Sequence, residues 1–180
     1  MTSLDGRHAQ WKETGALVVS RHDFKTEGLW LSAVVPPKSI LTFAKQLCDD
    51  GFTLLDVSTI ETKEGFFVTY HFDSFQEPGR LALRVLLDPQ KPQVPSLYPI
   101  YQGAEWHERE SFDFFGVEFV DNPNLVPLLL PDDLQGPPPL RKDPKNLASL
   151  SLLGVFGKPE ILDPQWADII NPPKEPKADA

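Results

Sequence analysis

The chain has 180 residues, 41% of them hydrophobic and 24% charged, which allows one ordinary globular domain with extensions. Its formal net charge of −9 argues against nucleic acid or an anionic membrane surface as a direct partner, because both require lysine and arginine to neutralise phosphate. Its single cysteine, Cys48, can form neither an intrachain disulfide nor, by itself, an iron–sulfur or cysteine-rich zinc site.

The amino-terminal half predicts a sheet covered by a helix. The first 15 residues are polar and lack an apolar h-region, so we expect no secretory signal there, and no apolar run approaches the length of a membrane span. Pro36 and Pro37 precede an apolar face of Ile40, Ala44 and Leu47 at helical spacing, which predicts a helix. Five segments rich in β-branched and aromatic residues are typical of strands: 16–20, 29–35, 52–60, 66–72 and 81–87. The fold class predicted is α+β, a two-layer domain in which helices pack on a mixed or antiparallel sheet.

Prolines dominate the rest of the chain. Four lie in residues 88–101, which predicts an extended connector and not a strand in the middle of the sheet. Twelve of the 19 prolines lie from Pro123 onward, among large apolar residues. We therefore predict a core domain at residues 1–121 and an extended, proline-rich docking arm at residues 122–180.

Residues 104–115 predict a charged, aromatic helix between these two parts. On such a helix Arg109 has Glu105 one turn before it and Asp113 one turn after it, a ladder of opposite charges that supports helical structure. Phe112 and Phe115 add an aromatic stripe. The glycine that follows is typical of a helix carboxyl terminus.

Patterns of catalysis are incomplete. His107 begins an HExxH zinc motif, but Ser111 replaces its second histidine. Glu108, Glu110 and Asp113 could form a proton-relay or acid–base cluster, yet an ion-paired structural helix face is the favoured interpretation.

A second charged cluster, Arg141, Lys142 and Asp143, is flanked by prolines on extended backbone. It could be a solvated loop. The alternative is an anchor that meets acidic or backbone acceptors on a partner, and Arg141 suits that role because its planar head group binds carboxylates with two hydrogen bonds.

Two separated motifs carry a family resemblance. The sequence ERESFDFFG at residues 108–116 is followed by PLRKD at residues 139–143, with PQVPSLYPIYQGAEW before them and LLLPDD between them. In this order they resemble the hydrophilic, 30 kDa-type C subunit of the proton-pumping NADH:quinone oxidoreductase, respiratory complex I, and of its membrane-bound hydrogenase relatives. The resemblance runs from about Val34 to Asp143 and favours the anchor role of Arg141.

The resemblance implies a structural and assembly subunit of the peripheral arm, without a cofactor or catalytic residue of its own. Iron–sulfur clusters, flavin and quinone are expected on partner subunits, and this chain is expected to dock on the quinone-site and iron–sulfur subunits at the cytoplasmic side of the cell membrane. The residues expected at inter-subunit contacts are those of the two motifs: Glu108, Arg109, Glu110, Asp113, Arg141, Lys142 and Asp143.

The chain departs from the family pattern between the two motifs. The family has a histidine and one or two arginines where this chain has Asn122, Val126 and Pro127, and two further prolines directly precede its PLRKD motif. This leaves open the matching subunit of a membrane-bound energy-converting hydrogenase or of another complex I-like oxidoreductase. A free-standing protein-binding module is the alternative of a different class.

Overall fold

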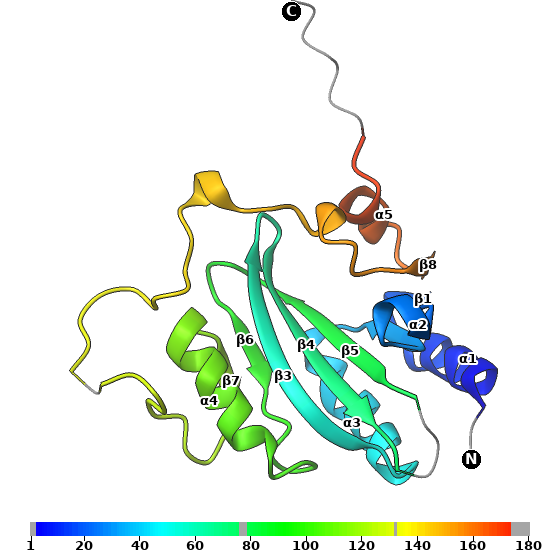
Figure 1. Cartoon of the computed structure of the whole chain (residues 1–180), viewed down its shortest axis with the longest axis horizontal. Helices are drawn as coiled ribbons and strands as arrows, with labels where there is room; N and C mark the ends of the chain where they lie inside the picture. Colours follow the sequence, from blue (N-terminus) through cyan, green and yellow to red (C-terminus); the bar gives the residue numbers. More distant parts are fainter. Residues whose placement is uncertain (1–2, 76–78, 132, 174–180) are drawn as a thin grey trace, which may run out of the picture.

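A six-stranded mixed sheet forms the centre of the computed structural model, which describes residues 3–75, 79–131 and 133–173 (Figure 1). Its strands are β1 Val18–Arg21, β2 Leu31–Val34, β3 Thr53–Thr62, β4 Gly65–Asp73, β5 Leu81–Leu87 and β8 Lys158–Ile161. They lie in the order β3-β4-β5-β2-β1-β8, in which β2 and β5 run parallel and every other neighbouring pair is antiparallel. The α+β prediction is confirmed, and all five predicted strands are present.

One face of the sheet is covered by α3 (Ile40–Asp49), which follows the short η1 (Pro37–Ser39). The predicted apolar face of α3 is fully buried together with Phe43. It packs in one core with the alternate residues of β5, Leu83, Val85 and Leu87, which are the set predicted to face the core. The period of two along β5 therefore fixed which of its faces meets the helix.

The opposite face is covered by residues 144–173, which we call the C-terminal segment. Its elements are η2 Pro144–Asn146, η3 Leu150–Leu152, β8 and α5 Gln165–Ile170. Phe156 lies between Phe67 of β4 and Trp166 of α5, with ring centroids 6.0 and 6.2 Å away. This part of the predicted docking arm thus packs on the chain's own sheet, and the domain boundary at residue 121 stays a prediction.

Three helices were not predicted: α5 in the C-terminal segment and two near the amino terminus. The polar start forms α1 (Leu4–Thr14), in which only Arg7 and Trp11 are buried, and α2 (Phe24–Glu27) is a single turn. Arg7 donates to Asp50 Oδ2 at 2.9 Å and lies 4.8 Å from the centroid of the Phe52 ring. Two buried residues do not make an apolar stripe, so periodicity gave no signal for α1.

The connector leads to α4 (Ala104–Phe115), whose bounds agree with the prediction. Gly116 ends the helix in a left-handed conformation, with φ 75°. Before and after α4, β6 (Gln93–Pro95) and β7 (Glu118–Val120) pair as a separate two-stranded parallel sheet. In Figure 1, α4 lies beside β3, at the end of the main sheet far from β8.

Candidate interaction surface

α4 packs against β3 through polar residues. Its buried residues are Ala104, Glu108, Ser111 and Asp113. Ser111 Oγ accepts a 3.0 Å hydrogen bond from Thr59 Oγ1 of β3. The aromatic side chains of α4 lie nearer the surface, and Trp106 is 65% exposed. A helix that buries Glu108, Ser111 and Asp113 while its phenylalanines stay partly exposed differs from an ordinary surface helix.

Glu108 is fully buried beneath α4. Its carboxylate accepts hydrogen bonds from Ser96 Oγ at 2.6 Å, from the Leu97 amide at 2.7 Å and from Asn122 Nδ2 at 2.7 Å. Burial raises the pKa of Glu108 above its usual value, and these three donors oppose that rise. Asn122 occupies the position where the family pattern has histidine, so the change leaves a hydrogen-bond donor in place.

Arg109 and Asp113 hold the backbone of a proline-rich segment against α4. We call residues 122–131 and 133–143 the strap. Arg109 donates to the carbonyl oxygens of Val126 and Pro127 at 3.0 and 2.7 Å. Asp113 Oδ2 accepts from three consecutive backbone amides, those of residues 128–130, at 2.9, 2.8 and 3.2 Å. Consecutive amides converging on one oxygen form a compact anion-binding nest.

The predicted charge ladder on α4 is therefore half correct. Arg109 forms its ion pair with Glu105, at 3.8 Å. Within the described residues Asp113 bonds to strap amides and not to Arg109. The strap amides have no hydrogen-bond partner in a β-sheet, so they donate to the Asp113 carboxylate instead.

The PLRKD motif ends the strap on β3 and β4. Arg141 Nε donates to Glu61 Oε1 at 2.9 Å, and the Lys142 amide donates to Glu61 Oε2 at 2.8 Å. The Arg141 guanidinium also lies 4.7 Å from the centroid of the Phe66 ring, within range of a cation–π contact. Asp143 accepts from the Lys145 amide and caps η2. The acceptor of Arg141 in this chain is thus Glu61, and its contact with a partner stays a prediction.

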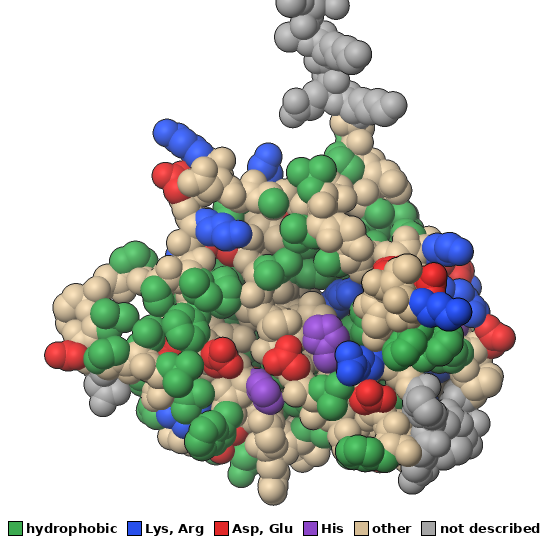
Figure 2. Space-filling model, viewed as in Figure 1, with side chains coloured by type: hydrophobic (Ala, Val, Ile, Leu, Met, Phe, Trp, Pro, Cys, Tyr) green, Lys and Arg blue, Asp and Glu red, His purple; other side chains and the backbone are tan. Residues whose placement is uncertain are grey.

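The strap and α4 together form an apolar surface. The strap crosses the helix end, where the Leu140 amide donates to the Phe114 carbonyl at 3.0 Å. A pocket of about 220 Å³ lies between them, lined mainly by Phe112, Leu130, Leu134 and prolines of the strap. Figure 2 shows hydrophobic side chains gathered over this lobe of the molecule. We call this region the α4–strap surface.

The sequence-predicted carboxylates do not form one cluster. Glu108 faces the interior, Asp113 binds the strap, and Glu110 is exposed. Within the described residues, no group of three or more His, Cys, Asp or Glu side chains could hold a metal ion. The favoured ion-paired helix face is wrong for these three carboxylates, because within the described residues Arg109 pairs with Glu105 and with none of them. Their structural role stays a prediction.

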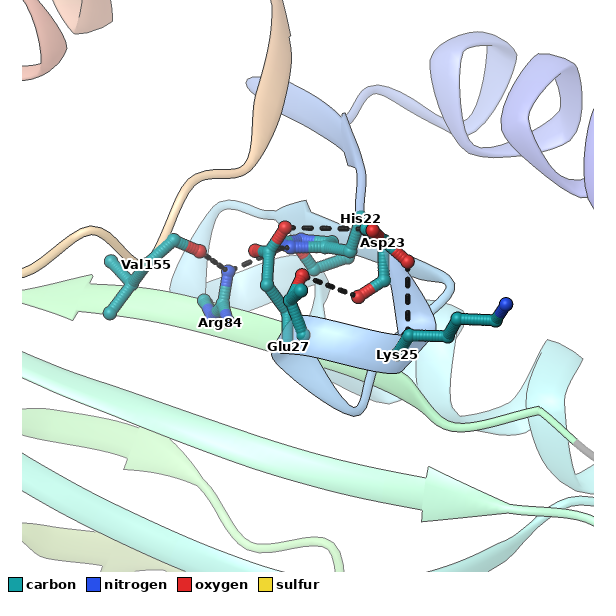
Figure 3. Close-up of polar contacts among 8 residues, drawn as sticks. His22, Asp23, Lys25, Glu27, Arg84 and Val155 are labelled. Atoms are coloured by element: carbon teal, nitrogen blue, oxygen red, sulfur yellow. Dashed lines mark hydrogen bonds and ion pairs between the residues drawn. The ribbon is translucent and has the colours of Figure 1, made fainter.

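A buried polar network that was not predicted holds the C-terminal segment (Figure 3). Arg84 of β5 is 5% exposed, and its Nη1 donates to Ser32 Oγ at 2.9 Å and to the Val155 carbonyl at 2.6 Å. His22 bridges Ser32 and Glu27, with nitrogen–oxygen distances of 2.7 and 2.6 Å. Burial lowers the pKa of Arg84 to about 10. The sequence signal was one arginine inside the apolar strand LALRVLL.

Residues 33–148 match the model of the family described as "Respiratory-chain NADH dehydrogenase, 30 Kd subunit". The chain belongs to this family. The matched region contains α4, the whole described strap and the PLRKD motif, so the α4–strap surface lies within the part that defines the 30 kDa subunit family.

Relatives in this family come from several oxidoreductases. The chain is 41% identical over 120 residues to the C subunit of the NADH-quinone oxidoreductase of Roseiflexus sp. (strain RS-1), covering 63% of this chain and 68% of that protein. It is 42% identical over 74 residues to the C subunit of the F(420)H(2) dehydrogenase of Methanosarcina mazei, covering 41% of this chain and 47% of that protein.

Two solved structures share the fold. Both are 22% identical to this chain. The trypsin-resistant fragment (1-134) of Nqo5 matches with a TM-score of 0.58 and covers 68% of this chain and 98% of that one. A chain of the membrane-bound sulfane sulfur reductase, an archaeal respiratory membrane complex, matches with a TM-score of 0.63 over 98% of each chain. Among the described helices, none combines the length and apolar character that a membrane span requires.

Proposed function

We propose that this chain is a non-catalytic structural and assembly subunit in the peripheral arm of a complex I-type NADH:quinone oxidoreductase. In this role it docks on the quinone-site subunit and on the iron–sulfur subunits. Family membership and 41% identity to the C subunit of an NADH-quinone oxidoreductase support the proposal.

One structural observation carries the non-catalytic part of the proposal. The charged residues of α4 bond mainly to the chain's own backbone and amide groups, through Glu108, Arg109 and Asp113. A catalytic acid or base needs access to a substrate in a cleft, whereas Glu108 is fully buried and Asp113 is enclosed by strap amides. These residues therefore shape a surface.

In this role the chain leaves the redox chemistry to other polypeptides. Iron–sulfur clusters, flavin and quinone would be bound by partner subunits, and this chain would carry none of them. It would be held peripherally, on the cytoplasmic side of the membrane, by those partners.

A related oxidoreductase is the second candidate. The F(420)H(2) dehydrogenase relative and the sulfane sulfur reductase chain, which matches over 98% of this chain, favour a complex I-like enzyme with another electron donor or acceptor. The structural role of this chain would be the same in both cases.

Affinity purification from the native host tests both candidates. The full chain carries a carboxyl-terminal tag, membranes are solubilised in a mild detergent, and co-purifying proteins are identified by mass spectrometry. We expect quinone-site and iron–sulfur subunits, iron–sulfur signals in electron paramagnetic resonance, and NADH-dependent quinone reduction by the purified complex. Activity with another donor, and none with NADH, selects the second candidate. Recovery of the tagged chain alone contradicts both and favours a free-standing module.

A further inference from the structure

The α4–strap surface exposes several large aliphatic side chains in one short stretch of chain. Leu129 is 63% exposed, Leu134 51%, Leu140 50% and Val126 49%. Single exposed apolar residues are normal on a monomer, whereas several grouped together mark an interaction site. In Figure 2 hydrophobic side chains gather on this lobe of the molecule.

Leu129, the most exposed aliphatic residue of this surface, is held on a fixed backbone. Its amide and those of its two neighbours are bound by Asp113, and the carbonyls of Val126 and Pro127 are bound by Arg109. Five hydrogen bonds from two side chains one helical turn apart therefore fix residues 126–130. Because the run is already ordered, a partner that covers Leu129 loses little conformational entropy.

The charges beside this surface specify what kind of partner fits. On the β3 side of α4, a second pocket of about 230 Å³ is lined by residues that include Asp56, Glu110, Phe114 and Leu140. Glu110 is exposed, and within the described residues its side chain has no hydrogen bond or ion pair. A carboxylate one helical turn from an aromatic ring suits a lysine or arginine side chain, which can pair with the first and lie over the second.

A second copy of this chain fits the surface poorly. The chain carries a net charge of −9, and a two-fold contact through this surface would bring Glu110 and Asp133 of both copies to the same interface. Like charges opposed across an interface disfavour association. A heterologous protein with basic residues has the complementary chemistry.

We propose that the α4–strap surface receives another subunit of the same complex, one that presents an apolar side chain next to Leu129 and a lysine or arginine to Glu110. This inference rests on the proposed function and names the surface and the chemistry of the partner. Leu129 supplies the apolar contact, Glu110 supplies the ion pair, and Arg109 with Asp113 positions the strap for both.

Two variants of the tagged full chain test the proposal, Leu129→Asp and Glu110→Lys. The matched controls are Leu152→Asp, at an η3 side chain that is 79% exposed, and Glu13→Lys, at an exposed carboxylate of α1. We expect each test variant to lower recovery of partner subunits at least tenfold, and each control to stay within about twofold of wild type. Circular dichroism melts of the purified chains verify that all four variants fold.

A charge-reversal experiment identifies the partner residue. Cross-linking of the wild-type complex with a carboxylate-to-amine reagent should join Glu110 to a lysine of one partner subunit. Changing that residue to glutamate should restore assembly with Glu110→Lys and impair it with the wild-type chain.

The outcomes separate the two proposals. If wild type recovers redox subunits and both test variants recover them equally well, the surface proposal is overturned and the proposed function stands. If wild type recovers no redox subunit, the proposed function fails and this proposal fails with it. If light scattering shows a wild-type dimer that Leu129→Asp dissociates, the occupant is a second copy and the proposal of a heterologous partner is overturned.

Discussion

Single charged residues of α4 determine the path of the backbone around it. Extended, proline-rich backbone that pairs with no strand leaves its amides and carbonyls without hydrogen-bond partners, and buried backbone groups need such partners. Glu108 supplies such partners on one side of the helix, and Arg109 and Asp113 supply them on another. At this scale charge acts through hydrogen bonds to backbone more than through ion pairs.

Glu108→Ala should destabilise the chain. The substitution removes the acceptor of three hydrogen bonds and leaves the buried Ser96 hydroxyl and Leu97 amide without it. Each buried group left unsatisfied costs about 1–3 kcal/mol, so we expect the free energy of unfolding to fall by about 3 kcal/mol. Urea denaturation of the full chain measures it. Glu110→Ala, at an exposed position, is the control and should change stability by about 0.5 kcal/mol or less; equal losses in both variants would contradict this account.

The strap is the element whose order depends on these residues. Arg109→Glu removes both hydrogen bonds to the strap carbonyls and places a third carboxylate near Glu105 and Asp113. We expect the strap to detach while the sheet and α3 stay folded, because neither contacts Arg109 through these bonds. Chymotrypsin cleavage at Leu128–Leu130 should accelerate about tenfold, which corresponds to a loss of about 1.4 kcal/mol of local stability.

The comparison for this prediction is Lys142→Glu. Lys142 binds Glu61 through its backbone amide, so its side chain can change without loss of that bond. Cleavage of the strap should then stay at the wild-type rate. A global loss of the circular dichroism signal in Arg109→Glu would instead make the strap part of the core.

Elements with a strong hydrophobic period were predictable, and elements fixed by distant contacts were not. The five strands are rich in β-branched and aromatic residues, and α3 has an apolar face with a period of 3.6. α4 was marked by its charge ladder, and Gly116 marks its end. β8 has the sequence KPEI, and Pro159 is tolerated there because the strand lies at the edge of the sheet. The charged residues of α4 and PLRKD stand out in the sequence, but their partners within the chain lie as far as 80 residues away, and no local pattern encodes such pairings.

The whole molecule is a sheet covered on both faces, and Arg84 joins one face to the C-terminal segment that covers it. Its guanidinium is buried in the sheet and bonds the Val155 carbonyl of the C-terminal segment, next to the apolar contacts of Phe156 and Trp166. Gly157 reinforces this contact, because a Cβ there would lie 2.6 Å from the Arg21 carbonyl oxygen. Close backbone approach and one buried cation together position the segment.

Arg84→Met should loosen the C-terminal segment selectively. The methionine fills the apolar volume but cannot donate to Val155 or Ser32. We expect hydrogen exchange of residues 150–166 to accelerate at least tenfold, while β3 and α3 keep their protection. Arg80→Met is the control, since Arg80 is exposed and pairs with Asp73 where β4 ends and β5 begins. Uniform acceleration across the chain would show that Arg84 supports the whole sheet.

Stability should also fall on mild acidification. Burial lowers the pKa values of His8, His22 and His71 below 6.5. A nearby carboxylate opposes each shift: Glu160 for His8, Glu27 for His22 and Asp56 for His71. Between 6.5 and the lower folded pKa values the unfolded chain binds more protons than the folded chain, so stability rises with pH in that window and is lost as pH falls through it. The urea midpoint should therefore be lower at about pH 5.5 than at about pH 7.5.

Glu108 contributes with the opposite sign, and a variant separates the two effects. Its raised pKa means that the folded chain keeps a proton that the unfolded chain releases, so this contribution falls as pH rises above 4.5. His22→Gln removes one titrating histidine, and amide groups can still bond Ser32 and Glu27. The loss of stability on acidification should shrink in this variant. An unchanged difference between the two pH values would mean that His22 titrates alike in the folded and unfolded chains, and that the polar network around Arg84 is open to water.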